Sequence, residues 1–326
     1  MNKLLTISPS PHLYQGDSVR KIMYSVIFAL LPALVWSFIV FGMPAVILTL
    51  TSVASCLVVE WAIQKYMLKT TPSINDGSAV ITGILLAMNM PAGLPVWMIV
   101  IGALVAIGVG KMSFGGLGQN PFNPALVGRV FLLISYPVQM TTWPNITNSG
   151  VDSVTEATPL ALIKEGVNSG QTVPQIMENI PAYRELLLGN FSGSLGEVSA
   201  ALLILGLLYM LIKKVVTWHI PVTTLATMFV FAAILWKANP EQFADPLFHI
   251  LTGGAMLGAI FMATDYSSSP MSKSGQIVYS IGIGVITICI RTWGAYPEGI
   301  SFAILIMNAF TPLINNYMKP KRFGEK

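Results

Sequence analysis

The sequence is poor in charged residues. Asp, Glu, Lys and Arg make up only 10% of its 326 residues, against about 25% in ordinary soluble domains. Apolar residues make up 54%. So few charges cannot cover the surface of a soluble domain of this length. The composition therefore excludes an ordinary soluble protein and predicts a polytopic membrane protein.

Cysteine and histidine are also scarce. Cys56 and Cys289 both lie in apolar runs without C-x-x-C spacing, which excludes an iron–sulfur cluster ligated by this chain alone. His12, His219 and His249 are scattered at the boundaries of apolar runs and form no motif with one another. We assign them structural or interfacial roles and predict no metal. There is no basic face interleaved with aromatic residues, so we expect no nucleic-acid partner.

Apolar runs with few charges recur ten times. They cover residues 21–41, 45–63, 78–90, 96–109, 123–136, 197–212, 220–236, 249–263, 275–290 and 299–313. A straight helix needs about 20 residues to cross about 30 Å of hydrocarbon, so the shorter runs must be broken helices or be shielded by neighbours. The expected fold is all-α with about ten transmembrane helices. Because the segment before the first run is too long and too polar for a signal peptide, we expect that run to remain in the mature chain.

Lysine and arginine predict the orientation. With a cytoplasmic N-terminus, thirteen positive charges fall inside and four outside, a clear positive-inside bias. The inside set is Lys3, Arg20, Lys21, Lys65, Lys69, Lys111, Lys213, Lys214, Lys273, Lys319, Lys321, Arg322 and Lys326, and the outside set is Lys164, Arg184, Lys237 and Arg291. Both termini are then predicted to be cytoplasmic, and the loop carrying Thr158 extracytoplasmic.

The two halves of the chain repeat each other faintly at an offset of 175 residues. Gly83 falls on Gly258, and Asn123 falls on Glu298. Five spans per half is an odd number, so the halves would insert in opposite orientations, as an inverted repeat with its functional site near the midplane. The alternative is two unrelated bundles with similar loop lengths. The predicted division is a cytoplasmic segment 1–20, a first five-helix repeat 21–136, an extracytoplasmic loop 137–196, a second repeat 197–313 and a cytoplasmic tail 314–326.

The third and eighth runs are the short pair that such an architecture makes from broken helices. Residues 78–90 reach only about 20 Å if helical, so they cannot cross alone. Segments rich in Gly, Pro and Asn precede the third and fifth runs, and the second of them holds Asn120 and Asn123. Such segments let the backbone approach a ligand closely. We predict a flavin or ion site at a re-entrant loop there, with a helix-packing turn as the alternative.

A polar loop reads DSVTEATPL over residues 152–160. Elementary rules predict only a turn and a helix start, since Pro159 suits the first helical position and Thr158 suits the cap. The pattern D-x-x-S/T-x-A-T, which begins at Asp152, includes Thr155 and ends at Thr158, also resembles the acceptor site for FMN attached through its phosphate to the last Thr.

Five motifs occur in order along nearly the whole chain. They read DGSAVITGILLAMNMP, GGLGQNPFNPALVGR, GSLGE, FMATDYSSSP and YPEGISFAILIMN. Together they resemble the family that contains the D subunit of the Rnf electron transport complex and the B subunit of the sodium-pumping NADH:quinone reductase. The chain is similar to the Rnf member in lacking a long N-terminal extension. It departs from the family at Glu156, where a Gly is usual two residues before the acceptor Thr.

The resemblance implies a flavoprotein subunit of an ion-translocating ferredoxin:NAD oxidoreductase in a prokaryotic inner membrane, beside Rnf subunits A, B, C, E and G, and not catalytic alone. It implies covalent FMN on Thr158, attached by a separate flavin transferase because a Thr hydroxyl is a poor nucleophile. It leaves open Na⁺ or H⁺ as the ion, and a second, non-covalent flavin such as riboflavin. The alternatives are a component like the B subunit of the quinone reductase and a non-redox channel for a small polar solute.

Ionisable residues in or beside membrane spans are costly and so are functional candidates. Glu60 ends the second run, Asp265 ends the eighth and Glu298 precedes the tenth. Each could bind or guide a cation. Glu298 is our first choice because it faces Asn123 across the proposed repeat, and Glu60 is the second. Arg129, inside the fifth run, could pair with one of them or with a flavin carbonyl. The alternatives are interfacial snorkelling for Glu60 and Asp265, and a helix N-terminal charge for Glu298.

Overall fold

The computed structural model describes residues 18–144, 155–189, 191–197 and 199–319. The described chain is helical apart from one two-residue antiparallel ladder, which joins β1 (Trp143–Pro144) to β2 (Thr155–Glu156). Within the described ranges, six helices are long and apolar enough to cross a membrane, and three shorter apolar helices accompany them. The predicted all-α polytopic class is confirmed.

Ten helical segments fall on the ten predicted runs. In the first half they are α1 (Val19–Phe41), α2 (Met43–Ala62) with its π-helical extension η1 (Ile63–Met67), α3 (Ser78–Met88), α4 (Val96–Leu104) with η3 (Val105–Val109), and α5 (Pro124–Ser135). In the second half they are α10 (Ala200–Ile212), α11 (His219–Ala238), α13 (Ala255–Leu257) with η5 (Gly258–Met262), α14 (Lys273–Trp293) and α15 (Ile300–Tyr317). Short turns η2 (Ile74–Asp76) and η4 (Met112–Phe114) lie between the segments of the first half.

Side-chain caps fix where several of these helices begin. The Ser18 hydroxyl accepts from the backbone N–H of Lys21 at the start of α1. Asn123 caps α5 in the same way and is followed by Pro124 at the first helical position. Each cap satisfies an N–H that has no partner inside the helix, and Pro at that position lacks the N–H altogether.

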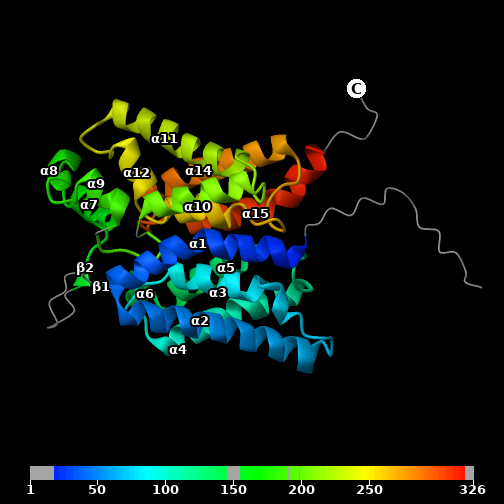
Figure 1. Cartoon of the computed structure of the whole chain (residues 1–326). Helices are drawn as coiled ribbons and strands as arrows, with labels where there is room; N and C mark the ends of the chain where they lie inside the picture. The colour runs from blue at the N-terminus through cyan, green and yellow to red at the C-terminus, as the bar shows by residue number, and fades with distance from the viewer. Residues whose placement is uncertain (1–17, 145–154, 190, 198, 320–326) are drawn as a thin grey trace, which may run out of the picture.

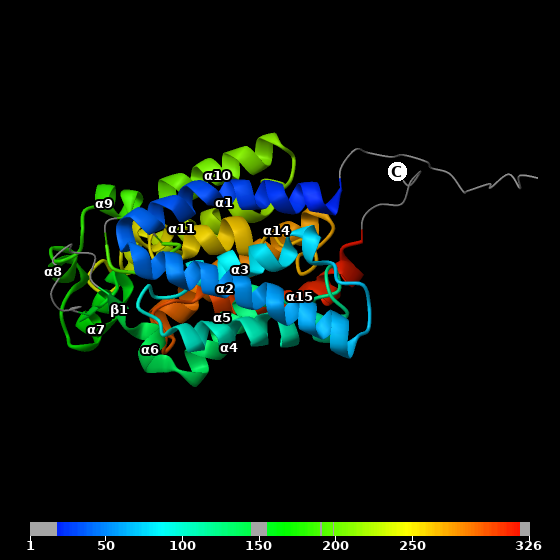
Figure 2. The same ribbon diagram turned by 60° about the horizontal axis from the view of Figure 1, so that its bottom comes forward.

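Consecutive helices alternate in direction, so the bundle has two ends (Figures 1 and 2). One end, here the loop end, carries α6 (Pro137–Thr141), α7 (Pro159–Asn168), α8 (Val173–Met177), α9 (Tyr183–Leu188) and α12 (Pro246–Leu251). The other, here the lysine end, carries Arg20, Lys21, Lys65, Lys213, Lys214 and Lys273. This segregation of charge is what the positive-inside prediction requires. The side of the membrane that each end faces stays a prediction.

Helices α1 and α10 pack side by side and antiparallel (Figures 1 and 2). The Trp36 indole, near the end of α1, donates to the Leu188 carbonyl shortly before α10. At the other end Lys21 of α1 and Lys213, directly after α10, line one cavity. Because α1 and α10 are the first helices of the two halves, their opposite directions are those of an inverted repeat.

Packing inside the two halves also corresponds. Helix α2 packs on α3 and α4, and α11 packs on η5 and α14. Gly83 and Gly258, which the 175-residue offset equates, each sit at a close helix crossing. A Cβ on Gly83 would lie 2.7 Å from the Val53 Cα, and one on Gly258 would lie 2.7 Å from a side-chain carbon of Ile300. Both positions therefore need a residue without a side chain.

The third and eighth segments are short, as predicted. Helix α3 has 11 residues, and α13 with η5 covers only residues 255–262. Matching side chains satisfy a carbonyl at the end of each. Asn89 donates to the Leu85 carbonyl at 2.6 Å, and the Thr264 hydroxyl donates to the Ile260 carbonyl at 2.7 Å. Away from water a helix end requires such partners.

Among the described residues, two of the positive charges counted for the orientation are buried inside the protein. Lys111 is 2% exposed and forms an ion pair with Glu60. Arg291 is 5% exposed and donates to the carbonyls of Thr252 and Gly253 at 2.9 and 3.1 Å. Both were assigned to a side of the membrane because each follows the end of an apolar run, at residues 109 and 290. The remaining charges keep the same bias.

The described part of the predicted loop between the two halves contains four short helices, α6 to α9, and three of them form a small folded cap. Apolar side chains from α7, α8 and α9 pack together with Phe248 of α12 in a core of their own. Lys164 of α7 donates to the carbonyls of Gly294 and Tyr296. Burial lowers the pKa of this Lys164 ammonium below its usual value. The cap is thereby fixed against the second half of the chain.

Candidate functional site

Thr158 occupies the start of a helix, as the sequence predicts. It is the N-cap of α7, and its hydroxyl accepts from the Ala161 N–H at 3.2 Å, with Pro159 at the first helical position. Its side chain is 2% exposed. Thr155 lies in β2, and Asp152 lies outside the described residues. The helix start is confirmed, and attachment of a cofactor at this position stays a prediction.

A cavity of about 270 Å³ lies at the loop end beside Thr158. Its walls come from α5, α6, α7 and the segment before α15. The lining residues are Arg129, Leu133, Met140, Thr141, Trp143, Ala157, Thr158, Ala161, Glu165, Tyr296, Pro297 and Glu298. The fold therefore brings three predicted site residues, Thr158, Arg129 and Glu298, into one cavity although they come from separate parts of the sequence.

Arg129 joins three elements in this cavity. Its guanidinium forms an ion pair with Glu298 and donates to the Ser301 hydroxyl at the start of α15. Its Nε donates to the Asn89 carbonyl, at the end of α3, at 3.3 Å. Both members of the ion pair are buried, and a buried pair persists only when further hydrogen bonds offset its desolvation. Of the predicted alternatives for Arg129, pairing with a carboxylate is confirmed, and the carboxylate is that of Glu298.

A second buried carboxylate, Glu197, lies behind this pair. It is 5% exposed and accepts from the Ser194 hydroxyl at 2.9 Å. It interacts electrostatically with Glu298, Arg129 and Arg291. The backbone around it closes the end of α3, since Gly196 donates to the Met88 carbonyl at 2.6 Å. Glu197 belongs to the GSLGE motif, but the sequence argument gave it no role. The sequence did contain one indication of a role for Glu197, because this carboxylate stands at the start of the apolar run 197–212.

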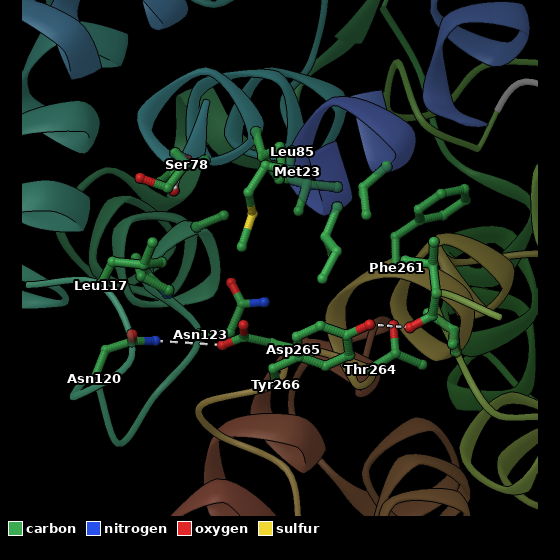
Figure 3. A pocket seen from close by; sticks show the side chains of 18 of the residues that line it. Met23, Ser78, Leu85, Leu117, Asn120, Asn123, Phe261, Thr264, Asp265 and Tyr266 are labelled. Carbon is green, nitrogen blue, oxygen red and sulfur yellow. Dashed lines mark hydrogen bonds between the residues drawn. The ribbon is translucent and has the colours of Figure 1, made fainter. Parts of the chain in front are cut away.

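A second cavity, of about 100 Å³, lies toward the lysine end (Figure 3). It is lined by parts of α1, α3, α5 and η5 and by the segments that follow η4 and η5. Figure 3 shows Asn120 and Asp265 facing each other at its edge. Asp265 accepts from Asn120 at 3.3 Å and from the hydroxyls of Ser267 and Ser268 at 3.0 Å each. Asn123, also in the wall, donates to the Met262 carbonyl at 3.1 Å.

Glu60 lies in the protein interior beside this second cavity. It is 1% exposed. The Lys111 ammonium lies 2.9 and 2.7 Å from its two carboxylate oxygens and also donates to the Ser78 hydroxyl at 2.6 Å. Snorkelling to the interface is therefore wrong for Glu60, because a snorkelling charge reaches water.

The two cavities lie toward opposite ends of the bundle, with α5 in the wall of both. Ala125 lines the lysine-end cavity and Arg129 the loop-end cavity. Four residues of α-helix rise about 6 Å. Asn123 donates to the Met262 carbonyl in the lysine-end cavity, whereas Glu298 pairs with Arg129 in the loop-end cavity. The expectation that Asn123 and Glu298 face each other was therefore wrong. An inverted repeat relates positions on opposite sides of the midplane, so Asn123 before α5 and Glu298 before α15 belong to different sides.

Comparison with known proteins shows which family the chain belongs to. The model of the NQR2, RnfD, RnfE family matches residues 6–324. The chain belongs to the NQR2, RnfD, RnfE family. It is 42% identical to the D subunit of the proton-translocating ferredoxin:NAD(+) oxidoreductase complex of Clostridium ljungdahlii, over 99% of this chain and 97% of that protein. It is 45% identical, with the same coverage, to the D subunit of the Na(+)-translocating ferredoxin:NAD(+) oxidoreductase complex of Acetobacterium woodii. It is 39% identical to the D subunit of the ion-translocating oxidoreductase complex of Stutzerimonas stutzeri, over 94% and 93%.

The five motifs that suggested the NQR2, RnfD, RnfE family are gathered around the two cavities. The α3, α5 and η5 motifs line the lysine-end cavity. The α5 and α15 motifs contribute Arg129 and Glu298 to the loop-end cavity, and GSLGE supplies Glu197 beside them. Lys111, Glu197 and Arg291 were not predicted as site residues from the sequence. Each is a charge whose burial depends on a partner distant in sequence.

Proposed function

We propose that the chain is the membrane-embedded D subunit of an ion-translocating ferredoxin:NAD⁺ oxidoreductase complex, and that it carries electrons through FMN bound covalently to Thr158. The observation that carries this proposal is the position of Thr158 in a cavity that the Arg129–Glu298 pair also lines. The names of its full-length relatives support the complex. The partners are then Rnf subunits A, B, C, E and G, and a flavin transferase that modifies Thr158.

The residues around Thr158 fit a phosphoester. A phosphate on its hydroxyl would lie at the N-terminus of α7, a helix of 10 residues, where unpaired N–H groups and the helix dipole favour negative charge. The cavity, at about 270 Å³, is close to the lower end of the usual range for ligand sites, about 300 Å³. FMN supplies the redox chemistry when bound. Arg129 is the one Arg or Lys in the described lining, and it places positive charge where reduction adds negative charge.

Asp265 is the carboxylate best placed to handle the coupling ion. Glu60 and Glu298 are each neutralised by a buried cation. Asp265 has no such partner among the described residues, and its neighbours are the hydroxyl and amide groups of Ser267, Ser268 and Asn120. A carboxylate of this kind beside a cavity is suited to bind a cation or a proton. The ion is Na⁺ or H⁺, because relatives named for either are about equally similar.

The lysine-end cavity limits what else can bind in this conformation. Its volume of about 100 Å³ holds an ion with a few water molecules. A non-covalent flavin such as riboflavin would require the helices around Ser78 and Phe261 to move apart.

The attachment proposal is tested by two threonine variants. Thr158→Val removes the oxygen to which the phosphate would be bonded, and we expect the in-gel flavin fluorescence of this chain to disappear. Thr141→Val is the matched control, because Thr141 lines the same cavity and lies outside the attachment motif. Fluorescence that persists in Thr158→Val and disappears in Thr155→Val would move the attachment to Thr155.

A further inference from the structure

A third cavity, of about 160 Å³, lies at the lysine end between α1 and the segment that follows α10. Lys21 and Ser25 line it from the first turns of α1, and Lys213 and Lys214 line it from the end of α10. Three ammonium groups and a hydroxyl thus converge on one small space. None of these residues belongs to the two cavities of the proposed electron and ion path.

The wall that carries two of the lysines is held in a defined conformation. Lys214 has a left-handed backbone with φ of 56°. Backbone hydrogen bonds from Lys214 to Leu211 and from Val215 to Met210 close the turn at 3.0 and 2.9 Å. The Tyr266 hydroxyl donates to the Val215 carbonyl from the segment after η5. A wall fixed in this way loses little conformational entropy when a ligand binds.

The charge of this wall is not balanced locally. Neither Lys213 nor Lys214 forms an ion pair within the described part of the chain. Lysines at a helix C-terminus complement the dipole of α10. The helix dipole explains why Lys213 and Lys214 lie at the end of α10. It does not explain why Lys21 and Ser25 of α1 line the same cavity.

The cavity also lies at the edge of the apolar surface. Ile212, directly before Lys213, is 79% exposed, and Leu208, one turn earlier, is 54% exposed. In a membrane these side chains contact lipid tails, so the adjacent lysines lie at headgroup depth.

We propose that this cavity, formed by Lys21, Ser25, Lys213 and Lys214, binds a phosphate group, and that its source is the headgroup of an anionic phospholipid. The ammonium groups donate to phosphate oxygens, while the Ser25 hydroxyl donates to the Lys21 carbonyl at 2.8 Å and forms part of the cavity wall. The same chemistry accepts inorganic phosphate, and the adjacent apolar surface favours the lipid. The inference does not depend on the flavin or on the coupling ion.

The test uses the intact complex in vesicles that contain phosphatidylglycerol with a photoactivatable group near its phosphate. We measure crosslinks to the peptides of α1 and of the α10 end by mass spectrometry. Lys213→Gln/Lys214→Gln should raise the lipid concentration for half-maximal labelling about 30-fold, since each lysine near an anionic surface strengthens binding roughly five- to sixfold. Lys65→Gln/Lys69→Gln is the matched control, because these lysines lie at the same end and Lys69 is also left-handed, with φ of 53°.

Competition identifies the source of the phosphate. Excess unlabelled phosphatidylglycerol should displace the probe, and phosphatidylcholine should not. Displacement by inorganic phosphate at equal concentration would keep the site and assign it to the free anion. Lys213→Arg/Lys214→Arg should restore labelling, which separates loss of charge from loss of folding. Equal labelling in the Gln double variant and its control, or equal competition by phosphatidylcholine, would overturn the proposal.

Discussion

Buried arginines in this molecule satisfy backbone groups as well as carboxylates. Arg129 donates to the Asn89 carbonyl at the end of α3, and Arg291 donates to the carbonyls of Thr252 and Gly253 at the end of α12. A carbonyl without a partner in the membrane interior costs several kcal/mol. A guanidinium has five N–H donors in a plane, so one side chain can both form an ion pair and close a helix end.

Arg129→Lys should destabilise the protein although the charge is kept. One ammonium group cannot reach Glu298, Ser301 and the Asn89 carbonyl together. Each buried polar group that is left without a partner costs about 1–3 kcal/mol. We expect a lower thermal midpoint for the complex. Arg184→Lys, on the exposed surface of α9, is the control and should leave the midpoint unchanged. Equal midpoints for both variants would show that the three contacts of Arg129 do not act together.

Glu60→Gln should be destabilising for a related reason. It leaves the Lys111 ammonium buried with only Ser78 and the new amide as partners. The double variant Glu60→Gln/Lys111→Met removes both charges and should recover much of the loss, because replacing a buried ion pair by apolar groups is often neutral. Thermal unfolding of the two variants measures this coupling. If the double variant were less stable than the single one, Lys111 would have another role in the folded state.

Asp265→Asn should weaken the dependence of electron transfer on the coupling ion. The amide keeps the size of the side chain but cannot carry the charge that attracts a cation. We expect covalent flavin and assembly to be retained, and the ion concentration for half-maximal stimulation to rise or the stimulation to vanish. Glu241→Gln, an exposed carboxylate at the loop end, is the control. An unchanged ion dependence in Asp265→Asn would place the ion path elsewhere.

At the scale of helices, the apolar runs predict where each segment lies, and Thr158 with Pro159 predicts where α7 begins. The caps at Ser18 and Asn123 were not predicted. The two short helices were also predictable, because their runs cannot span the membrane. Long-range pairings were not predictable. Arg129 and Glu298 are 169 residues apart. One sequence gives no signal that the segment before α15 meets the middle of α5.

The small cap around α7 should depend on Lys164. This side chain spans from α7 to the carbonyls of Gly294 and Tyr296, so Lys164→Met should loosen the cap while leaving the transmembrane helices intact. Hydrogen exchange of the α7 backbone should become faster, and exchange in α14 should not change. Unchanged exchange in α7 would show that the apolar core with Phe248 is sufficient to fix the cap.

At the scale of the whole molecule, the cofactor and ion proposals fall at opposite ends of one bundle. The attachment residue lies at the loop end, Asp265 lies toward the lysine end, and α5 passes along both cavities. The buried charges Glu197, Arg291, Arg129 and Glu298 lie on the loop-end side of α3 and η5. This arrangement lets a change of charge at the flavin act electrostatically on groups deep in the protein, where screening by water is weak.

The orientation of the bundle is tested by labelling single introduced cysteines in intact cells. Ser169→Cys, after α7 at the loop end, should react with an impermeant thiol reagent from outside. Lys65→Cys at the lysine end should react only after the cells are opened. Of the two native cysteines, Cys56 is fully buried and Cys289 is half-buried in α14, so the unsubstituted chain is labelled in parallel to measure the background. The reverse pattern of labelling would place Thr158 in the cytoplasm and contradict the positive-inside argument.

The central claim is covalent FMN on Thr158, and intact-mass spectrometry of the chain isolated from its native complex tests it most directly. We predict that the mass of the chain exceeds its sequence mass by one FMN less one water, and that fragmentation places this addition on the peptide containing Thr158. If the intact chain had the mass of its sequence alone, with no added group, that result would contradict covalent attachment of FMN.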